Sequence, residues 1–283
     1  MDFRDRFFRT LFFGASALSA FVTAAVLGFM VLLCLPVLKL DFIRHVLTAP
    51  WSPGQGQFGI LPMMAGTLCI AFLSLVISFP ISLGCAFFIE ILQPRGKGNL
   101  LKKLVQFMTA IPTVIYGFVG VFLLVPFIRE IFAFGSGMCI FSASLMLGLL
   151  ISPTLILFFS QSFSRVPQSY LNAVDALGGT TFQKLYHVIL PHAWKGMLTG
   201  IVLAFGRAMG DTLIALMISG NAVVMPSSLL DSARTLTAHI ALIFAADFDS
   251  MEFKILFISG IVLYMMTSLG IMFTKGFNRK GPA

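Results

Sequence analysis

Six long apolar stretches constrain this chain more than any other feature of its sequence. A helix that crosses the hydrocarbon core of a bilayer needs about 20 predominantly apolar residues. The predicted spans are residues 11–38, 61–91, 104–128, 138–160, 197–219 and 255–274. Hydrophobic residues make up 58% of the 283 residues and charged residues only 11%, which excludes a soluble domain of this length. The sequence therefore predicts an all-α integral membrane protein with six transmembrane helices.

The basic residues predict how these spans are oriented, because short loops rich in Lys and Arg remain in the cytoplasm. Thirteen of the 19 Lys and Arg residues fall at the two termini and in the second and fourth loops, on one side of a six-span chain. They are Arg4, Arg6, Arg9, Arg95, Lys97, Lys102, Lys103, Arg165, Lys184, Lys195, Lys275, Arg279 and Lys280. The opposite side carries five, and Arg207 lies within the fifth span. Both termini are therefore expected in the cytoplasm.

The same distribution explains the net charge of +8, since most of the excess lies beside helix ends on one face of the membrane. Membrane lipid accounts for these positions, so nucleic acid is not expected as a partner. The four cysteines and four histidines show no ligand spacing. Neither a disulfide framework nor a metal site is predicted from them.

The chain divides into three parts. Residues 1–59 hold an N-terminal interfacial segment, the first transmembrane helix and an outer loop; residues 60–275 hold the core, with a cytoplasmic loop at 166–196; residues 276–283 form a cytoplasmic tail. A GxGxxG pattern at Gly54, Gly56 and Gly59 lies between two membrane spans. Dinucleotide binding needs that pattern between a strand and a helix, so no nucleotide site is expected there.

Two further segments carry structural signals. Pro112 and Pro126 lie in the third span, where each proline removes a backbone donor and bends the helix. Simple packing and a kinked wall of a pathway both remain open interpretations of these prolines. In the outer loop 220–252 an apolar stretch is too short to cross the membrane, which predicts a re-entrant or surface helix.

The loop between the fourth and fifth spans predicts two short helices joined by a turn. The segment YLNAVDAL places Leu171 and Leu177 near one face of a helix, and Gly178 can end that helix. Thr180 or Thr181 can then cap a second helix through QKLYHVILP. Such a rigid protrusion suits a groove in another protein. An interfacial connector without a partner is the alternative.

This loop resembles the cytoplasmic signature of ABC importer permeases, which reads Glu-Ala-Ala, three residues, Gly, nine residues, Ile, one residue, Leu-Pro. The corresponding residues here are Asn172, Ala173, Val174, Gly178, Val188, Leu190 and Pro191. The resemblance implies that residues 170–191 couple to a separate ATPase, through Asn172, Ala173, Asp175, Gly178, Leu190 and Pro191. Asn172 stands where the family has glutamate and Val174 where it has alanine, so the contact with the ATPase is expected to differ there.

A second resemblance is narrower. Two segments are similar to the phosphate-specific (Pst) ABC transporter permeases, and more similar to the PstC type than to its PstA partner. They are GRAMGDTLIALMISGN and MPSSLLDSARTLTAHIAL. The IPTVIYG segment resembles the same family, and the similarity extends over most of residues 60–275. One residue departs from the family pattern, because Asp211 replaces the usual glutamate.

The resemblance implies a type I ABC importer permease (MetI-like) fold in the bacterial inner membrane. It also implies a function as the permease subunit of an ATP-driven importer of inorganic phosphate. The expected partners are a second permease of the PstA type, two ATPase subunits of the PstB type and an extracytoplasmic phosphate-binding protein of the PstS type. Because this chain has no GxxxxGK[ST] loop, ATP and magnesium are expected on the ATPase subunits. The chain itself is expected to be a transport subunit without a cofactor, and not an enzyme.

Arg207 and Asp211 are charges within the predicted fifth span. An arginine near the middle of a membrane helix costs about 2.5–3.5 kcal/mol on insertion scales, so such residues usually face a polar path. The two residues are four apart, hence on one face of a continuous helix and close enough to pair. Gly196, Gly200, Gly206 and Gly210 add GxxxG spacings that permit close helix contact. A structural ion pair that locks two helices is therefore one interpretation.

The functional interpretation places Arg207 against the substrate, because a guanidinium binds phosphate bidentately and stays charged. Asp211 could orient the arginine or accept a hydrogen bond from a protonated phosphate oxygen, which would favour phosphate over sulfate. Alternatives are a permease for sulfate, molybdate or phosphonate, an ATP-independent secondary anion transporter in which Asp211 carries a proton, and an ion channel. The loop signature argues against the last two, since neither needs a cytoplasmic docking element.

Overall fold

The computed structural model describes residues 3–35, 46–93, 96–133, 135–244 and 250–279. Within these ranges, six helices are long and apolar enough to cross a membrane, which confirms the six predicted spans. They cover Phe7–Cys34, Leu61–Leu92, Thr113–Phe132, Ile140–Ser164, Thr181–Gly210 and Met251–Gly270. The third and fifth spans differ in their course from the prediction.

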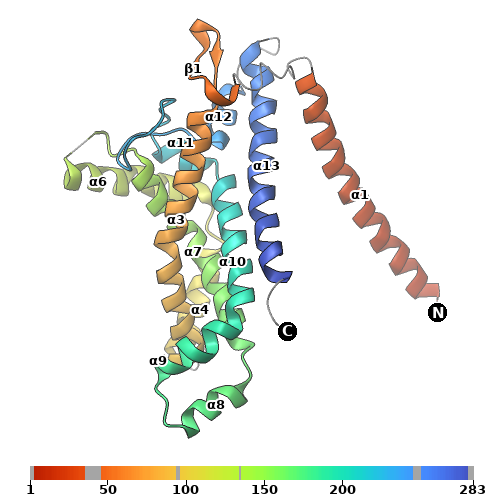
Figure 1. Cartoon of the computed structure of the whole chain (residues 1–283), viewed down its shortest axis with the longest axis vertical. Helices are drawn as coiled ribbons and strands as arrows, with labels where there is room; N and C mark the ends of the chain where they lie inside the picture. The colour runs from red at the N-terminus through yellow and green to blue at the C-terminus, as the bar shows by residue number, and fades with distance from the viewer. Residues whose placement is uncertain (1–2, 36–45, 94–95, 134, 245–249, 280–283) are drawn as a thin grey trace.

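The helical elements follow one another along almost the whole described chain (Figure 1). The α-helices are α1 (Phe3–Cys34), α3 (Leu61–Phe87), α4 (Lys97–Met108), α5 (Thr113–Val119), α6 (Val125–Phe132), α7 (Ile140–Ser164), α8 (Gln168–Ala176), α9 (Thr181–Gln183), α10 (Leu190–Gly210), α11 (Leu213–Ile218), α12 (Leu236–Ile243) and α13 (Met251–Arg279). The π segments are η3 (Phe88–Leu92), η4 (Gly120–Leu124) and η5 (Lys184–Ile189). A small antiparallel hairpin is formed by β1 (Trp51–Ser52), the 3₁₀ turn η2 (Pro53–Gln55) and β2 (Gln57–Phe58).

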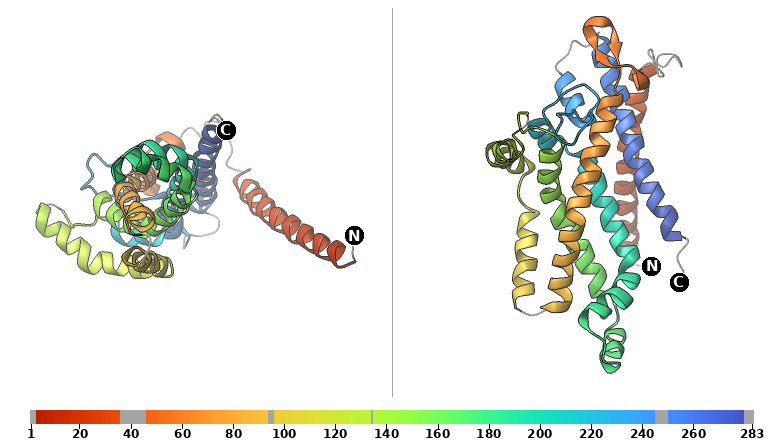
Figure 2. Two further views of the ribbon diagram at one scale, coloured as in Figure 1. Left: turned by 90° about the horizontal axis from the view of Figure 1, so that it is seen from below. Right: turned by 60° about the vertical axis from the view of Figure 1, so that its left-hand side comes forward.

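The helix α7 lies at the centre of the bundle, with α3 and α10 packed along it (Figure 2). Its large side chains Leu155, Phe159 and Phe163 are fully buried. Small residues bring α3 and α7 together, since a Cβ atom on Gly148 would lie 3.2 Å from the carbonyl oxygen of Ser74. Lipid tails are as apolar as leucine, so close packing of this kind, more than hydrophobic burial, holds membrane helices together.

The third span is broken, and the prediction of one helix over residues 104–128 is wrong. The helix α4 ends at Met108, and a new helix begins after Pro112, whose backbone is extended. Proline cannot donate to the carbonyl four residues earlier and clashes with it, which breaks the helix here. The Met108 carbonyl instead accepts hydrogen bonds from the Ile111 N–H at 3.3 Å and from the Tyr116 hydroxyl at 3.4 Å. The membrane-spanning helix therefore runs from Thr113 to Phe132.

The fifth span begins earlier and ends earlier than the predicted 197–219. Its helix starts at Thr181 and passes through η5 into α10 without a break. Pro191 has no N–H for the carbonyl four residues earlier, and the helix widens into a π turn just before it. At the other end α10 stops at Gly210, and Asp211 is extended before α11 begins.

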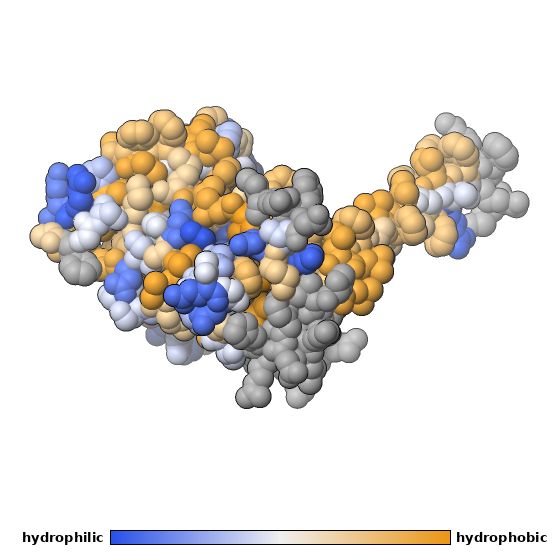
Figure 3. All heavy atoms as spheres, turned by 90° about the horizontal axis from the view of Figure 1, so that it is seen from above, coloured by the Kyte–Doolittle hydropathy of each residue, from blue (hydrophilic) through white to orange (hydrophobic). Residues whose placement is uncertain are grey.

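The outer loop that follows packs back onto the bundle. The backbone N–H of Leu236 donates to the Thr67 hydroxyl of α3 at 2.9 Å, and the Thr237 hydroxyl donates to the Asp211 carbonyl at 2.8 Å. Most of α12 is buried. The predicted re-entrant or surface helix is therefore a short helix enclosed at the end of the bundle. Figure 3 looks onto this end, where hydrophilic patches gather in the middle and apolar side chains cover the flanks.

The first span stands apart from the rest. One continuous helix, α1, includes the residues predicted as an interfacial segment. It packs along α13, where a Cβ atom on Gly260 would lie 2.3 Å from Met30 Cε. Figures 1 and 2 show α1 leaning away from the bundle, and its apolar side chains, such as Phe13 and Phe21, are mostly exposed.

Candidate functional site: an arginine stripe and a terminal protrusion

The segment between α7 and α10 forms a protrusion beyond the end of the bundle, which we define as residues 168–191 (Figure 1). It consists of α8, a turn and the start of the long fifth helix. Thr180 caps this second helix in a capping box, in which its hydroxyl accepts from the Gln183 N–H and the Gln183 side chain accepts from the Thr180 N–H. The predicted helix-turn-helix is confirmed, with Thr180 as the capping residue.

The turn depends on two glycines. Gly178 has a φ angle of +74°, in the left-handed region that glycine adopts without the strain imposed by a Cβ atom. Gly179 has a different constraint, because a Cβ atom there would lie 2.4 Å from Val174 Cγ1. The turn is thus set both by backbone conformation and by close packing against α8.

The polar residues of the protrusion make contacts within it. Gln168 donates to the Asn172 side chain at 3.1 Å along α8. Asp175 forms an ion pair with Lys184 across the turn, so its charge is partly offset inside the protrusion. Ala173 and Pro191 are exposed, whereas Leu190 is partly buried.

Large apolar side chains are exposed on this polar framework. Leu177 is 88% exposed and Phe182 is 70% exposed. A groove of about 520 Å³ lies between α8 and the following helix. Its walls are Tyr170, Ala173, Val174, Leu177, His187, Val188, Pro191 and His192. The protrusion therefore presents two exposed apolar side chains, Leu177 and Phe182, and a groove beside them.

Arg207 lies on an exposed stripe of α10. The stripe repeats at helical spacing and consists of Lys195, Thr199, Leu203, Arg207 and Gly210. The opposite face packs tightly, since Cβ atoms on Gly196 and Gly200 would meet Ser162 and Phe158 of α7 at 2.2 and 2.6 Å. By contrast, a Cβ atom on Gly206 or Gly210 would meet nothing within 4 Å. The predicted close helix contact is therefore present at the first glycine pair, while the second pair leaves open space beside Arg207.

The guanidinium of Arg207 is held by a residue that the sequence did not indicate. Its Nη1 donates to the Thr154 hydroxyl of α7 at 3.1 Å. In the part of the chain that the structure describes, no carboxylate lies within 4 Å of this guanidinium. A threonine in a membrane helix usually bonds its own backbone, so nothing in the sequence distinguishes Thr154 from the other hydroxyls of α7.

The predicted pairing of Arg207 with Asp211 on one helix is wrong, because the helix ends between them. The extended backbone at Asp211 turns the chain, and its Oδ1 accepts the N–H of Ile214 at 2.9 Å. This contact caps the start of α11 in the manner of an N-cap carboxylate. Arg207 remains close enough to act electrostatically on Asp211, but over more than ion-pair distance.

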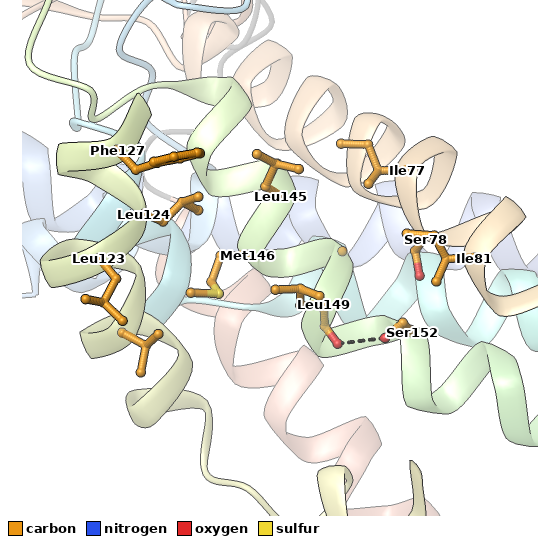
Figure 4. Close-up of a pocket in the computed structure, with 12 residues that line it drawn as sticks. Ile77, Ser78, Ile81, Leu123, Leu124, Phe127, Leu145, Met146, Leu149 and Ser152 are labelled. Atoms are coloured by element: carbon orange, nitrogen blue, oxygen red, sulfur yellow. Dashed lines mark hydrogen bonds between the residues drawn. The ribbon is translucent and has the colours of Figure 1, made fainter. Parts of the chain in front are cut away.

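The cavity in Figure 4 has a different character. It has a volume of about 530 Å³ between α3, α7 and the α5–α6 segment. Two hydroxyls, Ser78 and Ser152, are the polar groups of its lining, and Ser152 donates to the Leu149 carbonyl at 2.9 Å. Such an apolar cavity does not suit an oxyanion.

At the outer end of the bundle, the surroundings shift the pKa values of two titratable groups, His239 and Asp231. His239 is fully buried with its ring 4.3 Å from that of Trp51, and burial lowers its pKa to about 3, assisted by the positive charge of Arg234. Hydrogen bonds from the side chain and backbone of Ser227 lower the pKa of Asp231. Over the described ranges, no group of three or more His, Cys, Asp and Glu residues has the arrangement of a metal site.

Comparison with known families places this geometry in context. Residues 79–275 match the family described as "Binding-protein-dependent transport system inner membrane component". The chain is 30% identical over 236 residues to the probable ABC transporter permease protein YqgH of Bacillus subtilis, covering 82% of this chain and 76% of that one. It is 28% identical over 297 residues to the phosphate transport system permease protein PstC of Haemophilus influenzae, covering 96% and 94% of the two chains.

Solved structures show the same fold at low sequence identity. A chain of a bacterial alginate ABC transporter, in complex with an alginate-bound periplasmic protein, aligns with a TM-score of 0.72 at 12% identity, over 98% of this chain and 95% of that one. A chain of the inward-facing MetNI methionine ABC transporter aligns with a TM-score of 0.59 at 15% identity, over 84% and 99%. Six spans, a MetI-like fold and similarity to PstC permeases therefore agree. The chain belongs to the binding-protein-dependent transport system inner membrane components, as a multi-pass permease subunit of an ABC importer and not an enzyme.

Proposed function

We propose that this chain is the transmembrane permease subunit of an ATP-driven importer of inorganic phosphate. The observation that carries the proposal is the exposed position of Arg207 within a membrane-spanning helix. An arginine facing lipid at mid-membrane costs about 2.5–3.5 kcal/mol or more. A polar path that covers this stripe removes the cost, and a second permease of the PstA type would form the other wall of the path.

The chemistry at Arg207 supports an oxyanion as the substrate. With Nη1 bonded to a neutral hydroxyl, the guanidinium keeps its full charge and an edge for bidentate contact with phosphate. Relatives carrying the name PstC support phosphate over sulfate, molybdate or phosphonate. In this arrangement Asp211 accepts the Ile214 N–H and caps α11.

The protrusion is proposed to dock with an ATPase subunit of the PstB type, which binds ATP and magnesium. Exposed Leu177 and Phe182 would be buried in the docked state, since their apolar area favours contact with protein over water. Asn172 is uncharged, and Asp175 is paired with Lys184, so apolar contact would dominate the interface.

The proposed topology places both termini and the protrusion in the cytoplasm. In Figure 1 the protrusion, the start of α1 and the end of α13 lie toward the same end of the bundle, as an even number of spans requires. Basic residues concentrate at that end. An extracytoplasmic phosphate-binding protein of the PstS type would then meet the hairpin and the outer loops.

The proposal is tested by reconstituting this chain with its partner permease, ATPase and binding protein in liposomes. Labelled phosphate should enter only with ATP, and labelled sulfate should enter at a far lower rate. Uptake without the ATPase would replace the proposal with a secondary transporter. Equal or faster uptake of sulfate would retain the importer but refute phosphate as its specific substrate.

A further inference from the structure

The contact between Arg207 and Thr154 assigns a role to a residue that neither the motif nor its spacing indicated. We propose that Thr154 is a positioning residue, which holds the Arg207 guanidinium in the orientation that receives the transported oxyanion. The inference rests on the proposed function, in which Arg207 contacts phosphate. Its physical basis is the 3.1 Å hydrogen bond between α10 and α7.

A neutral acceptor suits this task better than a carboxylate. A carboxylate would neutralise the guanidinium and compete with the incoming anion for its donors, whereas a hydroxyl oxygen orients the group and leaves its charge intact. Of the five N–H donors on a guanidinium, Thr154 occupies one on Nη1. The described residues supply no other acceptor for Arg207, so the edge formed by Nε and Nη2 is available for a bidentate contact.

The surroundings of Arg207 agree with a guanidinium that is held by Thr154 at one nitrogen and available to the anion at the others. Thr154 lies on one side, on the partly exposed edge of α7. Next to Arg207 on α10, Gly206 and Gly210 carry no side chain, and a Cβ atom at either would meet nothing within 4 Å. Thr154 thus fixes one side of Arg207, while the neighbouring surface of α10 at Gly206 and Gly210 is free of side chains.

Thr154 is also well placed to be rigid. It belongs to α7, the most deeply buried of the six spans. It follows Pro153, which has no N–H for the Leu149 carbonyl, and the Ser152 hydroxyl donates to that carbonyl instead at 2.9 Å. The proline position is therefore satisfied locally, and Thr154 is left to bond across the helix interface. A β-branched side chain has few rotamers in a helix, which further limits its motion.

If Thr154 already holds the arginine side chain in its binding orientation, less conformational entropy is lost when the anion binds. That cost corresponds to about a 2- to 10-fold effect per immobilised side chain. Loss of the Thr154 hydroxyl should therefore reduce transport by a factor in this range, well short of the complete loss expected when the guanidinium itself is removed.

The test compares Thr154→Val, which is nearly isosteric but lacks the hydroxyl, with Thr154→Ser, which retains it. Both variants are reconstituted as the full complex, and phosphate uptake is measured per ATP hydrolysed, beside complex yield and basal ATPase activity. We expect Thr154→Val to lower uptake per ATP about 3- to 10-fold, with yield and basal ATPase activity unchanged. Thr154→Ser should stay within about twofold of the wild type, because it restores the acceptor.

Three outcomes would overturn the inference, and they separate it from the proposed function. In the first outcome, Thr154→Val transports phosphate like the wild type while Arg207→Leu abolishes uptake. This result would show that Thr154 has no positioning role, but it would still support Arg207 as the substrate-binding residue. Equal losses in Thr154→Val and Thr154→Ser, accompanied by lower complex yield, would show that the residue only packs. Full uptake in Arg207→Leu would refute the arginine site itself, and the positioning role with it.

Discussion

Replacing Gly178 with valine should weaken docking of the ATPase without disturbing the membrane bundle. The φ angle of +74° at Gly178 lies in the left-handed region, which costs an ordinary L-residue roughly 1–2 kcal/mol and a β-branched residue more. Nothing lies within 4 Å of a Cβ atom there, so the effect is conformational and not a clash. The turn between α8 and α9 would shift to another geometry.

The magnitude follows from this conformational cost. If docking requires the left-handed turn, a penalty of roughly 1–2 kcal/mol reduces the docking-competent fraction roughly 5- to 30-fold. The apparent Kd then rises by the same factor. We would titrate labelled ATPase subunit against the detergent-solubilised permease pair and compare the variant with wild type.

The matched control is Gly178→Asn, because asparagine adopts the left-handed conformation more readily than other residues with a side chain. It should bind the ATPase with an affinity much closer to that of the wild type. An unchanged Kd for Gly178→Val, with the complex intact, would refute the reasoning. A loss of equal size in both variants would show that the side chain, and not the backbone, is the cause.

Three further predictions follow from particular contacts. Asp211→Asn should retain most uptake because asparagine can still cap the Ile214 N–H, whereas Asp211→Leu should lose most of it; equal loss in both would restore a role for the negative charge. The unfolded chain protonates His239 near pH 6.5 but the folded chain only near pH 3, so stability should be complete above about pH 6.5 and fall as the pH drops below it. Thermal unfolding at pH 7.5 and pH 5 should show this loss, and His239→Phe should reduce it; an identical pH dependence in that variant would refute the assignment. A single cysteine at Gln55, on the exposed hairpin turn, should react with a membrane-impermeant reagent added outside the cell; labelling only from the cytoplasmic side would reverse the topology.

The spans and the protrusion could be predicted because their signals are local. An apolar stretch of about 20 residues is sufficient to define a membrane helix. In the protrusion, adjacent residues encode first the turn at Gly178 and then the cap formed by Thr180 and Gln183. The structure shows both the left-handed Gly178 and the expected cap. Side-chain chemistry within a few positions decides such elements.

The two helix breaks and the hydrogen-bond partner of Arg207 could not be predicted from the sequence. Proline in a membrane helix is compatible with a kink or a full break, and only the surrounding packing decided that Pro112 begins a new helix. The helix end at Gly210 placed Asp211 in a cap instead of an ion pair. Thr154 is 53 residues from Arg207 in sequence, and their contact depends on the packing of α7 against α10.

The central claim is that Arg207 is the cation that meets phosphate in the translocation path. The most direct measurement is ATP-dependent uptake of labelled phosphate by liposomes that contain the assembled complex with Arg207→Leu. The account predicts that uptake is abolished while assembly is unchanged, because removing this charge does not weaken insertion of the helix. Arg207→Lys should also transport poorly, since a point charge lacks the planar fork of the guanidinium. Full uptake by a correctly assembled Arg207→Leu complex would contradict the account and reduce Arg207 to a structural residue.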